Sequence, residues 1–371
     1  MVASGGDLDV VPGAVEKGGD GAADGACSEY CDPHPDSLGR AGEGSGSTPG
    51  VLPIRPCILA PVLETPAPAP NGILLLDKPG GITSHDLVSR TRRRAGTRKV
   101  GHAGTLDPMA TGLMILGLGP STRLLTYLVG LDKQYEATIR LGSSTTTDDQ
   151  EGEVLASAEP ALVAALAPES VSDAITALTG AIEQVPSTVS AIKVDGRRAY
   201  ARARDGEEVV LASRPVTVSE FAVLASRPGE GFLDLDVRVT CSSGTYIRAL
   251  ARDLGASLGV GGHLTALRRT AVGPFSVAQA GEIDELDVPA ALLPPTLVAG
   301  ELFPLLRLDA QEAGDLANGK RIPAPEAVAG AKGLLAAVGP GERLIGLAER
   351  RGTQLKSVVN FPTEDLRTAA S

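Results

Sequence analysis

Aromatic residues are scarce in this sequence. Its 371 residues include no tryptophan, five tyrosines and five phenylalanines. A tyrosine beside charged residues is therefore unusual in this chain. Two such tyrosines are Tyr135, in the segment DKQYEATIRLG, and Tyr246, in SSGTYIRALARDLG.

Cysteines and long apolar runs are also few. The four cysteines are Cys27, Cys31, Cys57 and Cys241. No second pair of ligands follows Cys27 and Cys31, so this spacing disfavours both a disulfide scaffold and a closed zinc site, and we expect no metal. No apolar run approaches the roughly 18 residues that a membrane span needs. The N-terminus lacks the basic and apolar segments of a secretory signal, which predicts a cytoplasmic protein that does not bind a membrane.

The net charge of −11 disfavours a nucleic-acid partner at first sight, but charge is unevenly distributed. Residues 1–70 hold ten acidic and three basic residues. The run RTRRRAGTRK at 90–99 contains six cations and no acid. It fits either a solvated helix face or a surface that binds phosphates. A second basic stretch at 184–206 includes Lys193.

Composition divides the chain into three parts. Residues 1–70 are rich in glycine, alanine, proline and acid, which predicts a disordered extension. Ordered sequence follows over 71–295 and ends in a proline-rich join at 288–295. Short strand-like pieces then predict a small β-rich domain over 300–365.

Apolar periodicity predicts both strands and helices in the ordered part. Strand patterns occupy 73–79, 135–141 and 233–241. Helices are expected from a cap at Thr83 or Ser84 toward Gly96, over 170–180, and from 247 onward. Residues 100–112 are expected to form a loop punctuated by glycines.

The segment GHAGTLDPMATG at 101–112 places glycines around one carboxylate. Pro108 favours extended backbone at Asp107, which would project that side chain from a loop, and glycines allow another backbone to approach closely. Alternatively, Asp107 caps a helix that begins at Pro108. His102 fits a base, a metal ligand or a hydrogen-bonding residue of the loop. Because no other histidine has ligand spacing, we favour a structural or substrate-contacting role.

Tyr135 and Arg248 are the other candidates. Tyr135 lies on the apolar face of its predicted strand, so core packing is the simpler interpretation. Arg248 interrupts an apolar stretch where a strand leads into a helix. A buried arginine needs a carboxylate partner, and both Asp107 and Asp253 could provide one.

These segments, in this order, resemble the TruB family, the bacterial tRNA pseudouridine-55 synthases. The matching motifs are GILLLDKPGGITSHD, GHAGTLDPMATGLMILGLGPSTRL, DKQYEATIRLGSSTTTDDQEGEV, QVPSTVSAIKVDGRRAYARARDG, SSGTYIRALARDLG and GGHLTALRRTAVG. They span residues 71–285. LANGKRI at 316–322 makes the tail similar to a reduced form of the family's PUA-like RNA-binding domain. Residues 1–70 match nothing in the family pattern.

The resemblance implies an α+β pseudouridine synthase fold. It has a mixed, largely antiparallel central sheet with flanking helices, an active site in a central cleft, and a small PUA-like C-terminal domain. The implied function is isomerisation of uridine 55 in the T-arm of tRNA. The implied roles are Asp107 as nucleophile, Tyr135 stacking on the target base, and Arg248 pairing with the aspartate.

The resemblance also implies supporting residues. Tyr246 and Leu267 resemble pocket-lining residues, Lys78 and Pro79 resemble a pair that supports the active-site loop, and His102 resembles a residue that contacts RNA. Phosphate contacts are expected from the basic runs, namely Arg92, Arg93, Arg94, Arg98, Lys99 and Lys193.

The reaction type also sets expectations about cofactors and partners. No redox step or group donor is needed, so no cofactor is expected. We expect a monomer that acts on tRNA without an obligatory protein partner, unlike the subgroup that works with guide RNAs. The alternatives are a non-catalytic tRNA-binding or tRNA-folding protein and a hydrolase. A hydrolase usually needs two carboxylates, and the GTLDP loop offers one.

Overall fold

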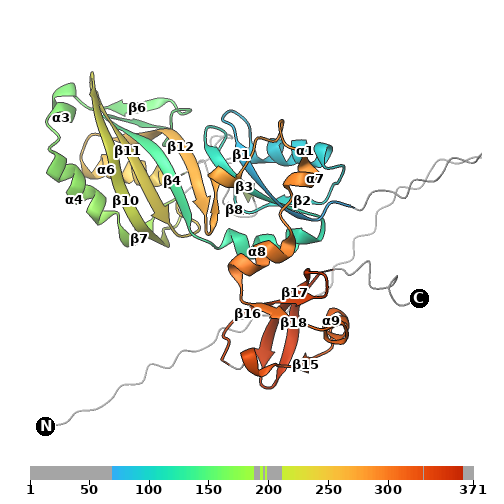
Figure 1. The fold of residues 1–371 in the computed structure, drawn as a ribbon. Helices are drawn as coiled ribbons and strands as arrows, with labels where there is room; N and C mark the ends of the chain where they lie inside the picture. The colour runs from blue at the N-terminus through green and yellow to red at the C-terminus, as the bar shows by residue number, and fades with distance from the viewer. Residues whose placement is uncertain (1–68, 188–192, 195–196, 199–210, 329, 362–371) are drawn as a thin grey trace, which may run out of the picture. The chain divides into compact units, whose positions relative to one another are not determined.

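A computed structural model describes residues 69–187, 193–194, 197–198, 211–328 and 330–361 (Figure 1). The predicted disordered extension lies outside the described residues except at its last two positions, and so does the side chain of Lys193. Among the described residues, no helix is both long enough and apolar enough to span a membrane.

A nine-stranded sheet forms the larger part of the fold. Its order is β1-β3-β12-β4-β11-β10-β7, with β2 beside β3 and β13 beside β12. All of these pairs are antiparallel except β3 with β12, which confirms the mixed, largely antiparallel sheet. The strands are β1 (Gly72–Lys78), β2 (Val100–His102), β3 (Thr111–Leu118), β4 (Lys133–Leu141), β7 (Gly180–Gln184), β10 (Arg214–Gly229), β11 (Phe232–Cys241), β12 (Gly262–Val272) and β13 (Phe275–Ser276).

The alternating sequences of β4 and β11 form these strands because one side of each is buried. In β4, the four predicted apolar positions are buried. Polar residues of the other face pair across strands: the Thr138 hydroxyl donates to Asp236 over 2.7 Å, and Arg140 donates to Asp234 over 2.8 Å. The prediction for these two strands is confirmed.

Helices cover the sheet where their apolar faces require burial. α1 (Ser84–Arg94) has Thr83 as its N-cap, which is one of the two predicted cap residues, and Thr83 forms a capping box with Asp86. α6 (Ile247–Ser257) buries one face against β12. The remaining helices of this part are η1 (Gly119–Leu124), α2 (Leu125–Val129), α3 (Pro160–Ala164), α4 (Pro168–Ala177), η2 (Val277–Gln279), α7 (Val288–Ala291) and α8 (Pro295–Leu302).

The structure confirms a helix in the segment 170–180 but ends it earlier, and it adds regular elements in two other segments. The helix predicted over 170–180 stops at Ala177, because Gly180 adopts a φ of 92° and begins β7. The proline-rich join at 288–295 contains α7 and the start of α8, since proline fits the first turn of a helix. The loop predicted over 100–112 starts with β2, which pairs with β3.

The C-terminal strands form a separate five-stranded sheet in the order β14-β16-β17-β18-β15. α8 contacts β16 and β17, and Val298 and Ala299 share an apolar cluster with Leu344 and Leu347. The prediction of a β-rich tail is confirmed. Its elements are β14 (Leu305–Arg307), α9 (Ala310–Ala317), β15 (Ile322–Pro323), η3 (Glu326–Val328), β16 (Leu334–Gly339), β17 (Arg343–Arg351) and β18 (Gln354–Asn360). Two short hairpins, β5 (Ser143–Thr145) with β6 (Val154–Ser157) and β8 (Lys193–Val194) with β9 (Arg197–Arg198), stand outside both sheets.

Candidate active site

Asp107 lies on the loop that joins β2 to β3. No helix begins at Pro108, so the interpretation of Asp107 as a helix cap is wrong. Instead, the Ala110 amide donates to the Asp107 carbonyl over 3.1 Å, which closes a tight turn. The Asp107 side chain remains 37 % exposed, and its Oδ2 is 2.9 Å from Nε of Arg248. The aspartate is therefore both accessible and held by a guanidinium.

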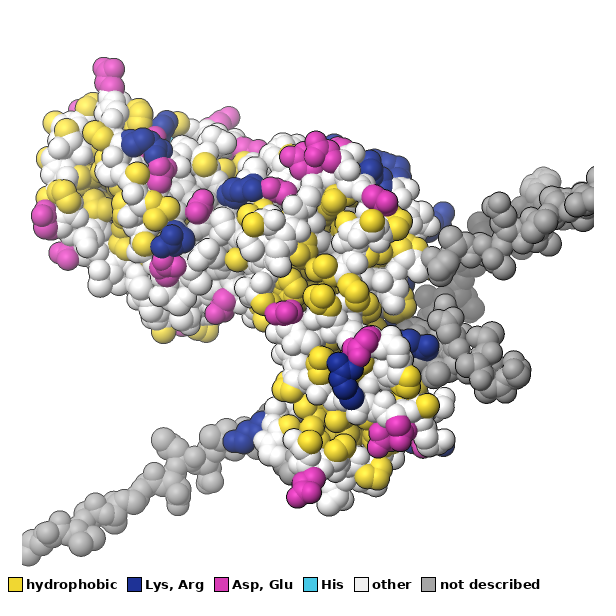
Figure 2. Space-filling view, viewed as in Figure 1, with side chains coloured by type: hydrophobic (Ala, Val, Ile, Leu, Met, Phe, Trp, Pro, Cys, Tyr) yellow, Lys and Arg dark blue, Asp and Glu magenta, His cyan; other side chains and the backbone are white. Residues whose placement is uncertain are grey.

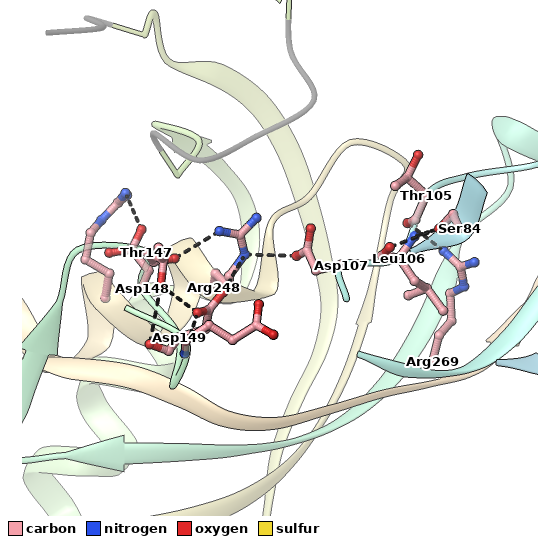
Figure 3. Close-up of polar contacts among 11 residues, drawn as sticks. Ser84, Thr105, Leu106, Asp107, Thr147, Asp148, Asp149, Arg248 and Arg269 are labelled. Atoms are coloured by element: carbon pink, nitrogen blue, oxygen red, sulfur yellow. Dashed lines mark hydrogen bonds and ion pairs between the residues drawn. The ribbon is translucent and has the colours of Figure 1, made fainter. Parts of the chain in front are cut away.

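Arg248 lies in the first turn of α6 and is almost fully buried. Its second carboxylate contact is Asp149, 3.6 Å from Nε, and it donates to the Thr147 carbonyl over 2.9 Å. Figure 3 shows Arg248 between Asp107 and this segment. The other candidate partner, Asp253, pairs with Arg252 instead.

Sequence reasoning missed Asp149. This carboxylate is buried, accepts from the Thr147 hydroxyl over 2.5 Å and from the Glu151 amide over 3.0 Å, and so cannot turn away from Arg248. The available signal was the carboxylate pair in TTDDQEG, which lies just after the strand that carries Tyr135.

Side chains from β1 and α1 hold the backbone of the Asp107 loop. Lys78 is fully buried, and its ammonium donates to the carbonyls of Pro79, Pro108 and Ala110 over 3.0, 3.2 and 2.6 Å. Ser84 donates to the Leu106 carbonyl and accepts from the Leu106 amide, both over 2.9 Å. Loop supports of this kind fix a reacting group before substrate arrives.

Burial lowers the pKa of Lys78 to about 8, although the negative charge of Asp107 opposes this shift. Desolvation penalises the ammonium, and the nearby carboxylate partly compensates. The ammonium therefore lies inside the protein, against the backbone of the loop. That Lys78 and Pro79 support an active-site loop stays a prediction.

A cavity of about 270 Å³ opens beside Asp107. Five residues predicted for the site line it together: Asp107, Tyr135, Tyr246, Arg248 and Leu267. Burial raises the pKa of the Tyr135 phenol, so this group stays protonated near neutral pH. Lys78, Pro79 and His102 are not among the lining residues.

His102 ends β2 and lies next to a second histidine. Its ring centroid is 6.2 Å from that of His85 in the first turn of α1, with the planes at 75°. This edge-to-face geometry lies within the range that stabilises aromatic pairs.

Some cations of the basic run at 90–99 donate hydrogen bonds to backbone carbonyls, and others are exposed without such bonds among the described residues. Arg94 donates to the carbonyls of Asp284 and Leu286 over 3.1 and 2.7 Å, and Arg92 donates to the Val100 carbonyl over 3.1 Å. Three other predicted cations are exposed, namely Arg93, Arg98 and Lys99. Their side chains donate no hydrogen bond to any residue that the structure describes. Figure 2 shows Lys and Arg side chains gathered beside α1.

Three family models match successive parts of the chain. They are described as the N-terminal domain of TruB family pseudouridylate synthase over residues 92–247, the tRNA pseudouridylate synthase B C-terminal domain over 248–293, and tRNA pseudouridine synthase II, C terminal, over 303–362. The tRNA pseudouridine synthase B of Leifsonia xyli subsp. xyli is 61% identical over 300 residues, which cover 80% of this chain and 98% of that protein.

The chain belongs to the TruB family. It is therefore a pseudouridine synthase, an isomerase. The TruB relative from Thermobifida fusca is 55% identical over 78% of this chain and 98% of its own length.

Solved structures agree with the TruB fold. A chain from an H/ACA ribonucleoprotein bound to a substrate RNA containing 2′-deoxyuridine has a TM-score of 0.57 at 23% identity, covering 79% of this chain and 86% of that one. A chain from a Cbf5–Nop10–Gar1 complex has the same TM-score at 24% identity, covering 79% of this chain and 84% of that one. At this level of identity the likeness shows the fold alone.

Proposed function

We propose that this chain isomerises uridine 55 in the T-arm of tRNA to pseudouridine, with Asp107 as the nucleophile. One observation carries the proposal: an accessible aspartate, ion-paired to a buried arginine, lines the same cavity as a buried tyrosine. The substrate class follows from the relatives, which are named tRNA pseudouridine synthase B.

The reaction breaks the N1–C1′ glycosidic bond, turns the uracil and joins C5 to C1′. C5 loses its proton and N1 gains one, so the product has the same composition as the substrate. Neither an oxidant nor a group donor is consumed. Asp107 supplies the nucleophile, and its bond to Arg248 fixes the attacking oxygen.

The target base reaches the cavity only after it leaves its stack in the RNA. Tyr135 then offers a ring for stacking, which contributes roughly 1–3 kcal/mol per base. Tyr246 and Leu267 enclose the base, and His102, held at the end of β2, contacts the RNA from which the base has left.

The exposed cations beside α1 bind phosphates of the T-arm. Arg93, Arg98 and Lys99 are the best placed, because Arg92 and Arg94 already donate to protein carbonyls. Lys193 contributes from the second basic stretch. The chain acts in the cytoplasm as a monomer and needs neither a guide RNA nor a protein partner.

The test is to incubate the purified protein with a T-arm stem-loop transcript and to map pseudouridine in the product. We expect conversion at position 55 and none in a matched transcript that carries cytidine there. Conversion only at another uridine, or only after another protein is added, would contradict the proposal.

A further inference from the structure

Two adjacent arginines of β12 differ sharply in their surroundings. Arg268 has a 39 % exposed side chain and binds both carboxylate oxygens of Asp77, over 3.0 and 2.6 Å. Arg269 is 1 % exposed, and no carboxylate among the described residues pairs with it. A buried cation without a counter-charge is costly, so its hydrogen bonds need an explanation.

The Arg269 guanidinium binds backbone carbonyls of β3 and of the first part of the Asp107 loop. Nε donates to the Leu113 carbonyl over 2.8 Å, and the two terminal nitrogens donate to Thr105 and Gly104 over 3.4 and 3.3 Å. The last two residues precede Asp107 by two and three positions, and Figure 3 shows Arg269 beside this segment. Through Gly104 and Thr105, Arg269 holds the part of the loop before Asp107, whereas Lys78 holds the part after it.

Backbone packing brings Arg269 close to this loop. Gly112 has a φ of 101°, and a Cβ there would lie 2.3 Å from the Arg269 carbonyl oxygen. Only glycine allows β3 and β12 to approach this closely. The strand that carries the arginine is therefore set directly against the strand that follows the loop.

Arg269 also faces the tyrosine of the site. Tyr135 is its direct partner in the antiparallel β4–β12 pair, and both line the cavity beside Asp107. Residues directly opposite each other share a face of the sheet. Burial raises the pKa of Tyr135, whereas the nearby charge of Arg269 lowers it.

We propose that Arg269 is a positioning residue, whose guanidinium holds the loop that carries Asp107 against the strand position opposite Tyr135. The proposal rests on the proposed roles of those two residues. A guanidinium is a rigid plane with five donors, so carbonyls bound at one edge determine where the remaining donors point. The ammonium of a lysine is a single, rotatable point of charge and transmits no such orientation.

The experiment compares Arg269→Lys and Arg269→Met with Arg268→Lys as a matched control on the same strand. Three quantities are measured for each full-length variant: thermal stability, the kcat and KM for tRNA by release of tritium from C5 of uridine, and the ¹³Cζ resonance of Tyr135. The absence of tryptophan and the small number of tyrosines simplify that spectrum. Tyr135→Phe identifies the resonance.

We expect Arg269→Lys to shift the Tyr135 resonance and to lower kcat by about 10²-fold, the effect of misplacing a reacting group, with KM nearly unchanged. Arg268→Lys should lower the melting temperature without moving that resonance. A folded Arg269→Lys protein with an unmoved Tyr135 resonance, or with a loss of kcat no larger than in the control, would overturn the proposal.

If Arg269→Met does not fold, the Tyr135 resonance and the kcat of Arg269→Lys are sufficient to test the proposal. Failure of the proposed function gives a different result, namely turnover by Asp107→Asn. The resonance of Tyr135 reports on Arg269 regardless of that outcome.

Discussion

Two groups of basic residues in this protein have opposite surroundings. Lys78, Arg248 and Arg269 are each less than 5 % exposed and donate to protein carbonyls or carboxylates around the Asp107 loop. Arg93, in the last turn of α1, and Lys99, which follows that helix, are exposed. Buried donors with fixed acceptors shape a reacting site before substrate binds, whereas exposed cations attract an anionic ligand. Substitutions in the first group should therefore change kcat, and those in the second should change binding.

The largest effect on product formation is expected when Asp107, the carboxylate that pairs with buried Arg248, is made neutral. Asp107→Asn keeps the shape of the side chain and removes the carboxylate proposed as the nucleophile, so product formation should fall by at least about 10⁴-fold. Arg248 retains Asp149 as a partner, so the fold should persist. Pseudouridine mapping measures the loss, and tRNA binding by fluorescence anisotropy should remain within about threefold. Retained turnover would disprove the nucleophile assignment.

An intermediate effect on kcat is expected when a rise in pH deprotonates Lys78. Its pKa of about 8 means that the ammonium loses a proton as the pH rises past that value. A neutral amine has two donors for the three carbonyls of Pro79, Pro108 and Ala110, so the loop should loosen and kcat should fall about tenfold. Lys78→Met should have a lower kcat that lacks this inflection. An inflection near pH 8 that survives in Lys78→Met would assign it to another group.

Stability should respond to the same titration with the opposite sign. The unfolded chain keeps the Lys78 proton up to the ordinary value of 10.5, so unfolding takes up a proton between about pH 8 and 10.5. The Lys78 contribution to the free energy of unfolding therefore rises over this window. Lys133 has a similarly lowered pKa, but its contribution cancels when denaturant midpoints of wild type and Lys78→Met are compared across pH.

The smallest effect is expected for the exposed group. Arg93→Ala combined with Arg98→Ala should weaken tRNA binding several-fold and leave kcat unchanged. Each lost phosphate contact should reduce the slope of log affinity against log salt by roughly 0.7–0.9. Arg94→Ala is the matched control, because its guanidinium already binds the Asp284 and Leu286 carbonyls and its loss should leave the salt slope unchanged. Equal slopes in all variants would place the phosphate contacts elsewhere.

Much of the fold could be predicted because its signals are local. Alternation in β4 and β11, and the cap at Thr83, depend on residues within a few positions of one another. The end of α4 and the presence of α7 depend on how these segments pack against neighbouring strands and helices that are distant in the sequence. Packing decides between these alternatives, so the sequence pattern misplaced the end of α4 and did not reveal α7.

The candidate site shows the same division. The sequence by itself determined which side chains were available: one aspartate among glycines, a tyrosine on a strand, and an arginine at a strand–helix junction. Only the tertiary structure decided that Arg248 pairs with Asp107 and Asp149 and not with Asp253, and that Arg269 is buried opposite Tyr135. The physical reason is the order β3-β12-β4, which places segments more than a hundred residues apart in hydrogen-bond contact that no local pattern encodes.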